Sequence, residues 1–183
     1  FSDKVQVEAW AERLTPEART AFAARAALRA FPMLAAMDAR QPLVVLSTLR
    51  ALIVSSAASG GQTDAIKEGA YSAFKNGIIA TIANLAAYEA SSAAINAVRS
   101  GADTTADASA SAARAIGTIA NAAHEIALEA AQADGQLIAE GLEPQELFAH
   151  PLWVPPWGAE GGFPVDDQSM RALWEAEPEV WDF

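Results

Sequence analysis

Apolar side chains between residues 64 and 134 recur at steps of three and four, which is the spacing of one face of an α-helix. The first part of the stretch has this spacing at Tyr71, Phe74, Ile78, Ile82, Leu85, Tyr88, Ser92 and Ile95. The second part has it at Ala112, Ile116, Ile119, Ala123, Ile126 and Ala130. Gly101 interrupts the pattern, and Asp103 is of a residue type that caps a new helix. The pattern predicts a long Ala-rich antiparallel helical hairpin, with arms of about thirty residues, or roughly 45 Å, each.

Shorter helical patterns precede the hairpin. One covers residues 3–14, and a second follows Thr15-Pro16-Glu17, which offers an N-cap, a proline at the first helical position and an acid in the first turn. The stretch from Leu43 to Ala58 is strongly apolar and has Arg50 as its one charge, so we expect it at the centre of the core. The chain is therefore predicted to be all-α, a bundle of five or six helices built round the hairpin.

Residues 136–183 have a different composition from the rest of the chain. Their prolines and glycines interrupt regular elements, which leaves room for short helices near residues 144–149 and 167–177. We expect residues 1–135 to form the helical bundle. Residues 136–183 are predicted to be an acidic Pro/Gly/Trp-rich strap that packs on the bundle within the same domain.

Four of the five tryptophans belong to this strap, namely Trp153, Trp157, Trp174 and Trp181. Such large rings are rarely left in water without a surface to cover. In one interpretation they clamp the strap onto the bundle. In the other they are binding residues for a partner, because aromatic side chains dominate interaction hot spots.

Charge is distributed unevenly along the chain, whose formal net charge is -11. Residues 1–75 hold nine Lys and Arg against seven Asp and Glu, whereas residues 76–183 hold three against sixteen. An acidic half repels phosphate backbones, so nucleic acid is not an expected partner. A membrane is not expected either, because Asn76, Asn84 and Asn96 interrupt an Ala-dominated stretch that would partition weakly into lipid.

Few residues offer chemistry. With no cysteine there is no disulfide, thiolate nucleophile or cysteine-ligated metal, and we expect a cytoplasmic protein. His124-Glu125 would begin a zinc-protease helix, but Leu128 stands where that motif needs a second histidine. Ser72 and Lys75 have the Ser-x-x-Lys spacing of penicillin-recognising enzymes without the companion elements. We therefore predict no catalytic residues, no metal and no cofactor.

Three short features together resemble the N-terminal helical regions of uncharacterised bacterial proteins: the run Ala23–Pro32, the Ala-rich helical array, and an acidic ending with Trp174 and Glu179-Val180-Trp181-Asp182-Phe183. The resemblance brings no activity with it, and it implies the leading module of a longer bacterial protein. The function expected from the sequence is a non-catalytic helical interaction or regulatory module that binds a protein partner or self-associates. Two other classes stay open: a small helical enzyme using His124 and His150 between bundle and strap, and a membrane-active helical hairpin.

Overall fold

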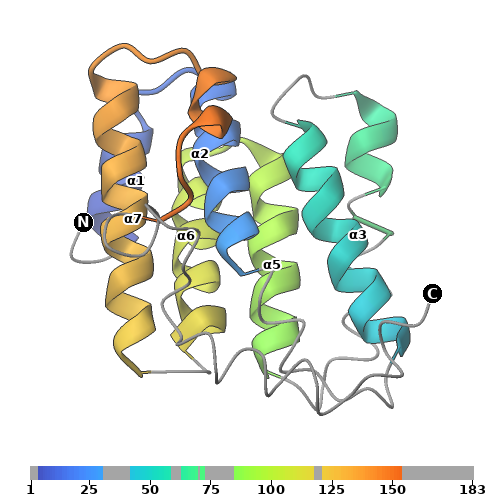
Figure 1. The fold of residues 1–183 in the computed structure, drawn as a ribbon. Coiled ribbons are helices and arrows are strands. Elements are labelled where there is room, and N and C mark those ends of the chain that lie inside the picture. Colours follow the sequence, from blue (N-terminus) through green and yellow to red (C-terminus); the bar gives the residue numbers. More distant parts are fainter. Residues whose placement is uncertain are drawn as a thin grey trace.

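The computed structural model describes residues 4–30, 42–58, 63–69, 71–72, 85–117 and 121–153. Within these ranges every regular element is a helix and there is no strand, which confirms the all-α prediction (Figure 1). The named helices are α1 (Lys4–Ala11), α2 (Pro16–Arg29), α3 (Pro42–Ala58), α5 (Leu85–Arg99), α6 (Ala102–Gly117), α7 (Asn121–Ala139) and the 3₁₀-helix η2 (Glu146–Ala149). Residues 64–69 and 71–72 are also helical.

Helix α2 is the centre of the bundle. It packs against α3, α5, α6 and α7, and ten of its fourteen residues are buried. Alanine on several of its faces lets these neighbours approach closely. The helix begins as the sequence predicts, because Thr15 Oγ1 accepts a hydrogen bond of 3.2 Å from the Ala18 N–H and Pro16 occupies the first helical position.

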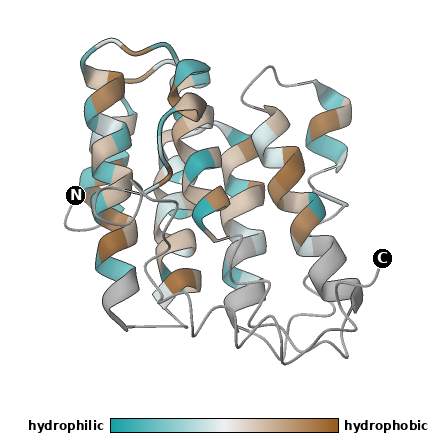
Figure 2. Cartoon of the chain, viewed as in Figure 1, coloured by the Kyte–Doolittle hydropathy of each residue, from teal (hydrophilic) through white to brown (hydrophobic). Residues whose placement is uncertain are grey.

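The expectation that residues 43–58 would be central is wrong. Helix α3 packs on α2 and α5 on the opposite side of the bundle from α1 (Figure 1), and its Ile53 is 59% exposed. Strongly hydrophobic positions remain visible along this outer helix (Figure 2). A helix can pack closely against several neighbours when small side chains lie on several of its faces. Helix α2 is rich in alanine, whereas α3 is rich in Leu, Ile and Val.

The chain reverses at Gly101, as the sequence predicts, and α5 and α6 form an antiparallel pair. Gly101, not Asp103, takes the N-cap position: its carbonyl accepts the Thr105 N–H at 2.8 Å, and its N–H donates to Thr104 Oγ1 at 2.9 Å. The bond from the Gly101 N–H to the Thr104 side chain is one half of a capping box, since glycine has no side chain to make the other half. A two-contact ion pair then joins the arms, with Arg114 Nε and Nη2 each 3.0 Å from an oxygen of Glu89.

Both arms of this hairpin are shorter than predicted. The second arm ends at Gly117, and α7 begins at Asn121 and returns along α6, so that Ala106 and Ala131 share one core cluster. On the first arm, Ile66 packs in the same cluster as Ile95 and Val98, although a straight helix would place residues 66 and 95 roughly 44 Å apart. An Ala-rich pattern looks alike on every face, so it does not reveal where a helix folds back.

The end of α7 is set by Gly141, which adopts a φ of 94°. The Gly141 N–H donates to the Ile138 carbonyl and the Leu142 N–H to the Leu137 carbonyl, each at 3.0 Å, which is a Schellman motif. The short helix expected near 144–149 is present as η2. The predicted helix at 167–177 and the positions Phe74, Ile78, Ile82 and Ile119 lie outside the described residues.

Replacing Ser100 with glycine tests the turn between α5 and α6. Ser100 has a φ of 53°, a left-handed conformation that costs an L-residue about 1 kcal/mol or more. Ser100→Gly removes this strain and should raise the free energy of unfolding, measured in urea, by up to about 1 kcal/mol. Part of that gain is offset because glycine loses more conformational entropy when the chain folds. Ser100→Ala keeps the Cβ atom and should give no gain. If both variants changed the free energy of unfolding by the same amount, backbone strain at Ser100 would be contradicted.

Candidate functional site

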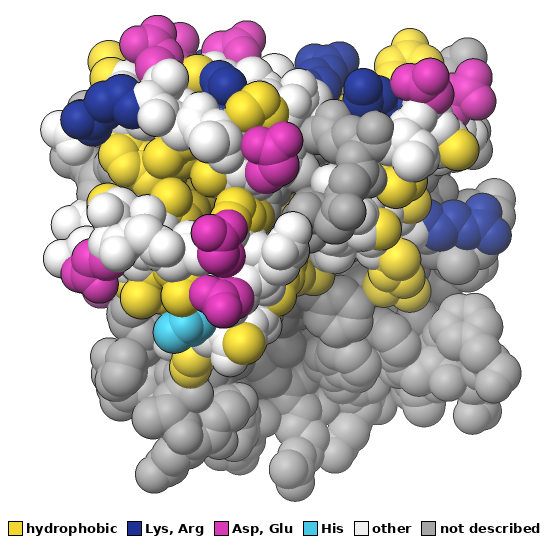
Figure 3. Space-filling view, turned by 90° about the horizontal axis from the view of Figure 1, so that it is seen from above, with side chains coloured by type: hydrophobic (Ala, Val, Ile, Leu, Met, Phe, Trp, Pro, Cys, Tyr) yellow, Lys and Arg dark blue, Asp and Glu magenta, His cyan; other side chains and the backbone are white. Residues whose placement is uncertain are grey.

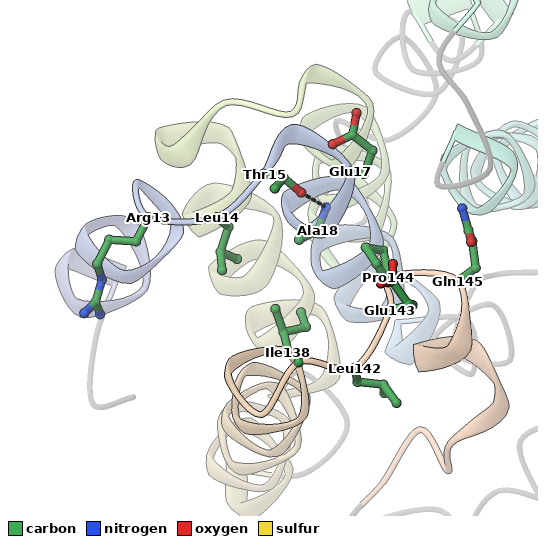
Figure 4. Close-up of a pocket in the computed structure, with 11 residues that line it drawn as sticks. Arg13, Leu14, Thr15, Glu17, Ala18, Ile138, Leu142, Glu143, Pro144 and Gln145 are labelled. Carbon is green, nitrogen blue, oxygen red and sulfur yellow. Dashed lines mark hydrogen bonds between the residues drawn. The ribbon is translucent and has the colours of Figure 1, made fainter.

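A groove of about 390 Å³ lies where the connection between α1 and α2 approaches the end of α7 (Figure 4). Its walls come from both ends of the chain: the α1–α2 connection and first turn of α2 on one side, the last turn of α7 and residues 141–145 on the other. The lining residues are Arg13, Leu14, Thr15, Glu17, Ala18, Ile138, Gly141, Leu142, Glu143, Pro144 and Gln145. The Schellman turn at Gly141 therefore shapes one wall directly.

The groove combines apolar side chains with a few charged ones. Leu14 and Ile138 point toward the space between the two walls (Figure 4), and Leu142 lies beside them. Seen from above, this end of the molecule carries a hydrophobic area with basic and acidic side chains around it (Figure 3). The Thr15 hydroxyl is already used to cap α2. Leu14, Ile138 and Leu142 give the groove an apolar part that apolar side chains could contact, and Glu17, Glu143 and Arg13 supply its charges.

A buried charge cluster lies deeper in the bundle, between α2 and α7. Arg25 and Arg29 on α2 both contact Asp134 on α7, and all three are at most 2% exposed. Arg25 Nη2 lies 3.0 Å from Asp134 Oδ1 and its Nε 3.1 Å from Oδ2, while Arg29 Nη2 lies 2.6 Å from Oδ2. Both carboxylate oxygens are thus engaged by guanidinium groups.

Most of the remaining donors of the two arginines bind backbone carbonyls of η2 and of the segment that follows it. Arg25 donates to the carbonyls of Leu147, His150 and Pro151 at 2.6 to 2.9 Å, and Arg29 Nε donates to that of Leu152 at 2.6 Å. These bonds hold residues 147–152 against α2. Burial lowers the pKa of Arg29, the charge of Arg25 lowers it further, and Asp134 opposes both effects. The cluster connects α2, α7 and residues 147–152.

Of the four predicted binding tryptophans, the structure describes Trp153. Its ring is 7% exposed, belongs to a core cluster with Ile116 and Ala130, and has its centroid 6.0 Å from the Arg29 Cζ. Trp157, Trp174 and Trp181 lie outside the described residues.

Neither the groove nor the smaller cavity is lined by both of the histidines considered for an enzyme. His150 lines a smaller cavity beside Asp134 and Arg29. His124 lies near the start of α7, close to Gly117 at the end of α6, and it lines neither the groove nor the smaller cavity.

Sequence reasoning missed both the groove and the charge cluster. The cluster leaves a signal: Arg25 and Arg29 are four residues apart inside an Ala-rich helix, and Asp134 continues the buried spacing of Ala127, Ala130 and Ala131. Charges on a buried face need partners, so the pattern could have suggested pairing. The groove leaves no such signal because its walls are far apart in the sequence.

Neither a metal-binding cluster nor a membrane-spanning helix is present within the described ranges. No group of three or more His, Cys, Asp or Glu side chains in this part of the chain could hold a metal ion. None of the helices that the structure describes is both long and apolar enough to cross a membrane. The chain matches no protein-family model, and no curated protein or solved structure is similar to it.

Replacing Asp134 with asparagine tests the charge cluster. Asp134→Asn leaves two buried guanidinium groups without a counter-charge, so the free energy of unfolding should fall by about 3–5 kcal/mol in urea denaturation followed by circular dichroism. The matched control is Asp107→Asn, which removes the exposed ion pair with Lys4. The hydrogen bond between Lys4 and Asp107 raises the pKa of Lys4. Exposed ion pairs nevertheless contribute less than about 1 kcal/mol to the free energy of unfolding. Similar losses in both variants would contradict the role given to Asp134.

Proposed function

We propose that this chain is a non-catalytic helical interaction module that binds a segment of a protein partner in the groove between the α1–α2 connection and the end of α7. The observation that carries the proposal is the groove itself, with its apolar interior and charged border. Its volume of about 390 Å³ falls within the range of roughly 300–1,000 Å³ that is typical of binding pockets. Two or three apolar side chains of a partner would fill it.

The charges around the groove suggest what flanks those apolar side chains. Glu17 and Glu143 outnumber Arg13 among the lining residues, and the whole chain carries a formal net charge of -11. A partner segment with apolar anchors and basic flanking residues would match both features, because complementary charge speeds association and disfavours wrong partners. An acidic segment would be repelled.

The arrangement of the other polar groups supports a binding role over catalysis. Both oxygens of Asp134, which lines the same cavity as His150, already bond to arginines, so this carboxylate is occupied by contacts within the protein. His124 is at neither cavity. Neither of these two cavities brings His124 and His150 together, which favours a binding role over the small-enzyme alternative.

A photoreactive amino acid placed at Gln145 tests the proposal. Gln145 is exposed and lines the groove, so in the native host it should crosslink to one defined protein that mass spectrometry identifies. Leu142→Glu and Leu14→Glu, from opposite walls, should each reduce that crosslink at least about tenfold, because each places a charge where the partner's apolar side chain would lie.

Val5→Glu is the matched control. Val5 lies on α1, is 72% exposed and does not line the groove, so the same kind of substitution there should leave the crosslink unchanged. Circular dichroism of each variant checks that it folds, and light scattering shows whether the captured protein is a second copy of the chain. A crosslink that persists in both groove variants would overturn the proposed site.

A further inference from the structure

The smaller cavity, of about 160 Å³, lies where the end of α2, the middle of α7 and residues 150–153 meet. It is separate from the groove and plays no part in the proposed partner binding. Arg29 and Asp134 supply charge to its lining. The apolar lining comes from Ala130, Ala133, Leu137, Pro151, Leu152 and Trp153. An apolar cavity with a few charged groups is typical of small-molecule sites.

Arg29 is incompletely paired at this cavity. Its Nε donates to the Leu152 carbonyl at 2.6 Å, and its Nη2 donates to Asp134 Oδ2 at 2.6 Å and to the Ala130 carbonyl at 3.2 Å. Its Nη1, by contrast, is buried and has no hydrogen-bond partner among the residues that the structure describes. Buried guanidinium donors are costly to leave unpaired, so this atom favours an acceptor other than those of the described residues.

The charge of the cluster identifies the kind of acceptor. Arg25 and Arg29 carry two positive charges, and Asp134 is the one carboxylate that bonds to them within the described ranges. Within the described part of the chain, one positive charge is therefore left over in a buried place. Burial lowers the pKa of Arg29, which reflects the cost of keeping that charge away from water. A ligand with a single negative charge would balance it, whereas a dianion would exceed it.

We infer that this cavity is a binding site for a small aliphatic monocarboxylate. The ligand's carboxylate accepts hydrogen bonds from Arg29 Nη1, and its hydrocarbon chain lies against Leu137, Leu152 and Trp153. A cavity of about 150 Å³ is large enough for benzene, so butyrate, which has the same number of non-hydrogen atoms, is of a suitable size. A bound ligand would join the segment 150–153 to α2 and α7 more firmly.

Titration of the whole chain with butyrate, followed by calorimetry and by the Arg29 Nε–H resonance, tests the site. Butyrate should bind saturably with one site per chain and raise the unfolding temperature by a few degrees. Butyramide has the same shape without the charge, so it should bind at least about tenfold more weakly. Ala133→Leu fills the cavity without touching the arginines and should abolish butyrate binding.

Ala139→Leu is the matched control, because Ala139 lies on the same helix, is exposed and lines neither cavity. It should bind butyrate as the unchanged chain does, and both variants are checked for folding by circular dichroism. The inference is overturned if butyrate gives no saturable signal at concentrations of tens of millimolar, if butyramide binds equally well, or if a folded Ala133→Leu variant still binds butyrate.

Discussion

The burial of Arg25 and Arg29 on the central helix is the constraint on which the rest of the fold depends. A guanidinium group enters a protein interior only when its donors and its charge find partners, and the helix that carries these two arginines cannot supply them. Asp134 supplies the negative charge from α7, and the carbonyls of residues 147, 150, 151 and 152 accept most of the remaining hydrogen bonds. The position of α7 and the path of the chain after η2 both follow from this need.

Alanine makes the central position of α2 geometrically feasible. Phe22 is the large apolar side chain that is fully buried on this helix, and it packs with Val7, Ala106 and Ala131 where α1, α6 and α7 meet. Elsewhere α2 meets its neighbours through alanines, as in the cluster that joins Ala26 and Ala27 to Ala93 and Ala94. Small contacts of this kind bury little apolar area per residue. Charged pairs and caps therefore carry more of the fold's specificity than they would in a Leu-rich bundle.

The sequence predicted the parts of the fold that depend on local signals. Thr15 and Pro16 predicted where α2 begins, and Gly101 predicted the reversal between α5 and α6. The predictions that the structure overturned failed for a common physical reason. The return of α7 along α6 and the edge position of α3 depend on which helix can accept neighbours on several sides, which hydrophobic periodicity does not report. The strongly apolar sequence of α3 suggested a core position for that helix. The core position belongs instead to α2, which has small side chains and two paired arginines.

The candidate sites were harder to predict because each joins segments from opposite ends of the chain. His124 and the tryptophans could be selected from the sequence as single residues. The groove, by contrast, forms between the α1–α2 connection and a turn about 125 residues later in the sequence. The arginine pattern in α2 was visible as a spacing. That both arginines pair with one buried carboxylate could be seen only from the position of Asp134 in the structure.

The separation of these partners in the sequence also has a consequence for how the protein folds. Arg25 and Asp134 are 109 residues apart, and Arg25 and Pro151 are 126 apart. During synthesis α2 leaves the ribosome long before the groups that neutralise it, so its arginines must stay hydrated until residues 134–152 have emerged. The central helix can then take its buried position only as one of the last events of folding. Such long-range closure slows folding and makes the final step highly cooperative.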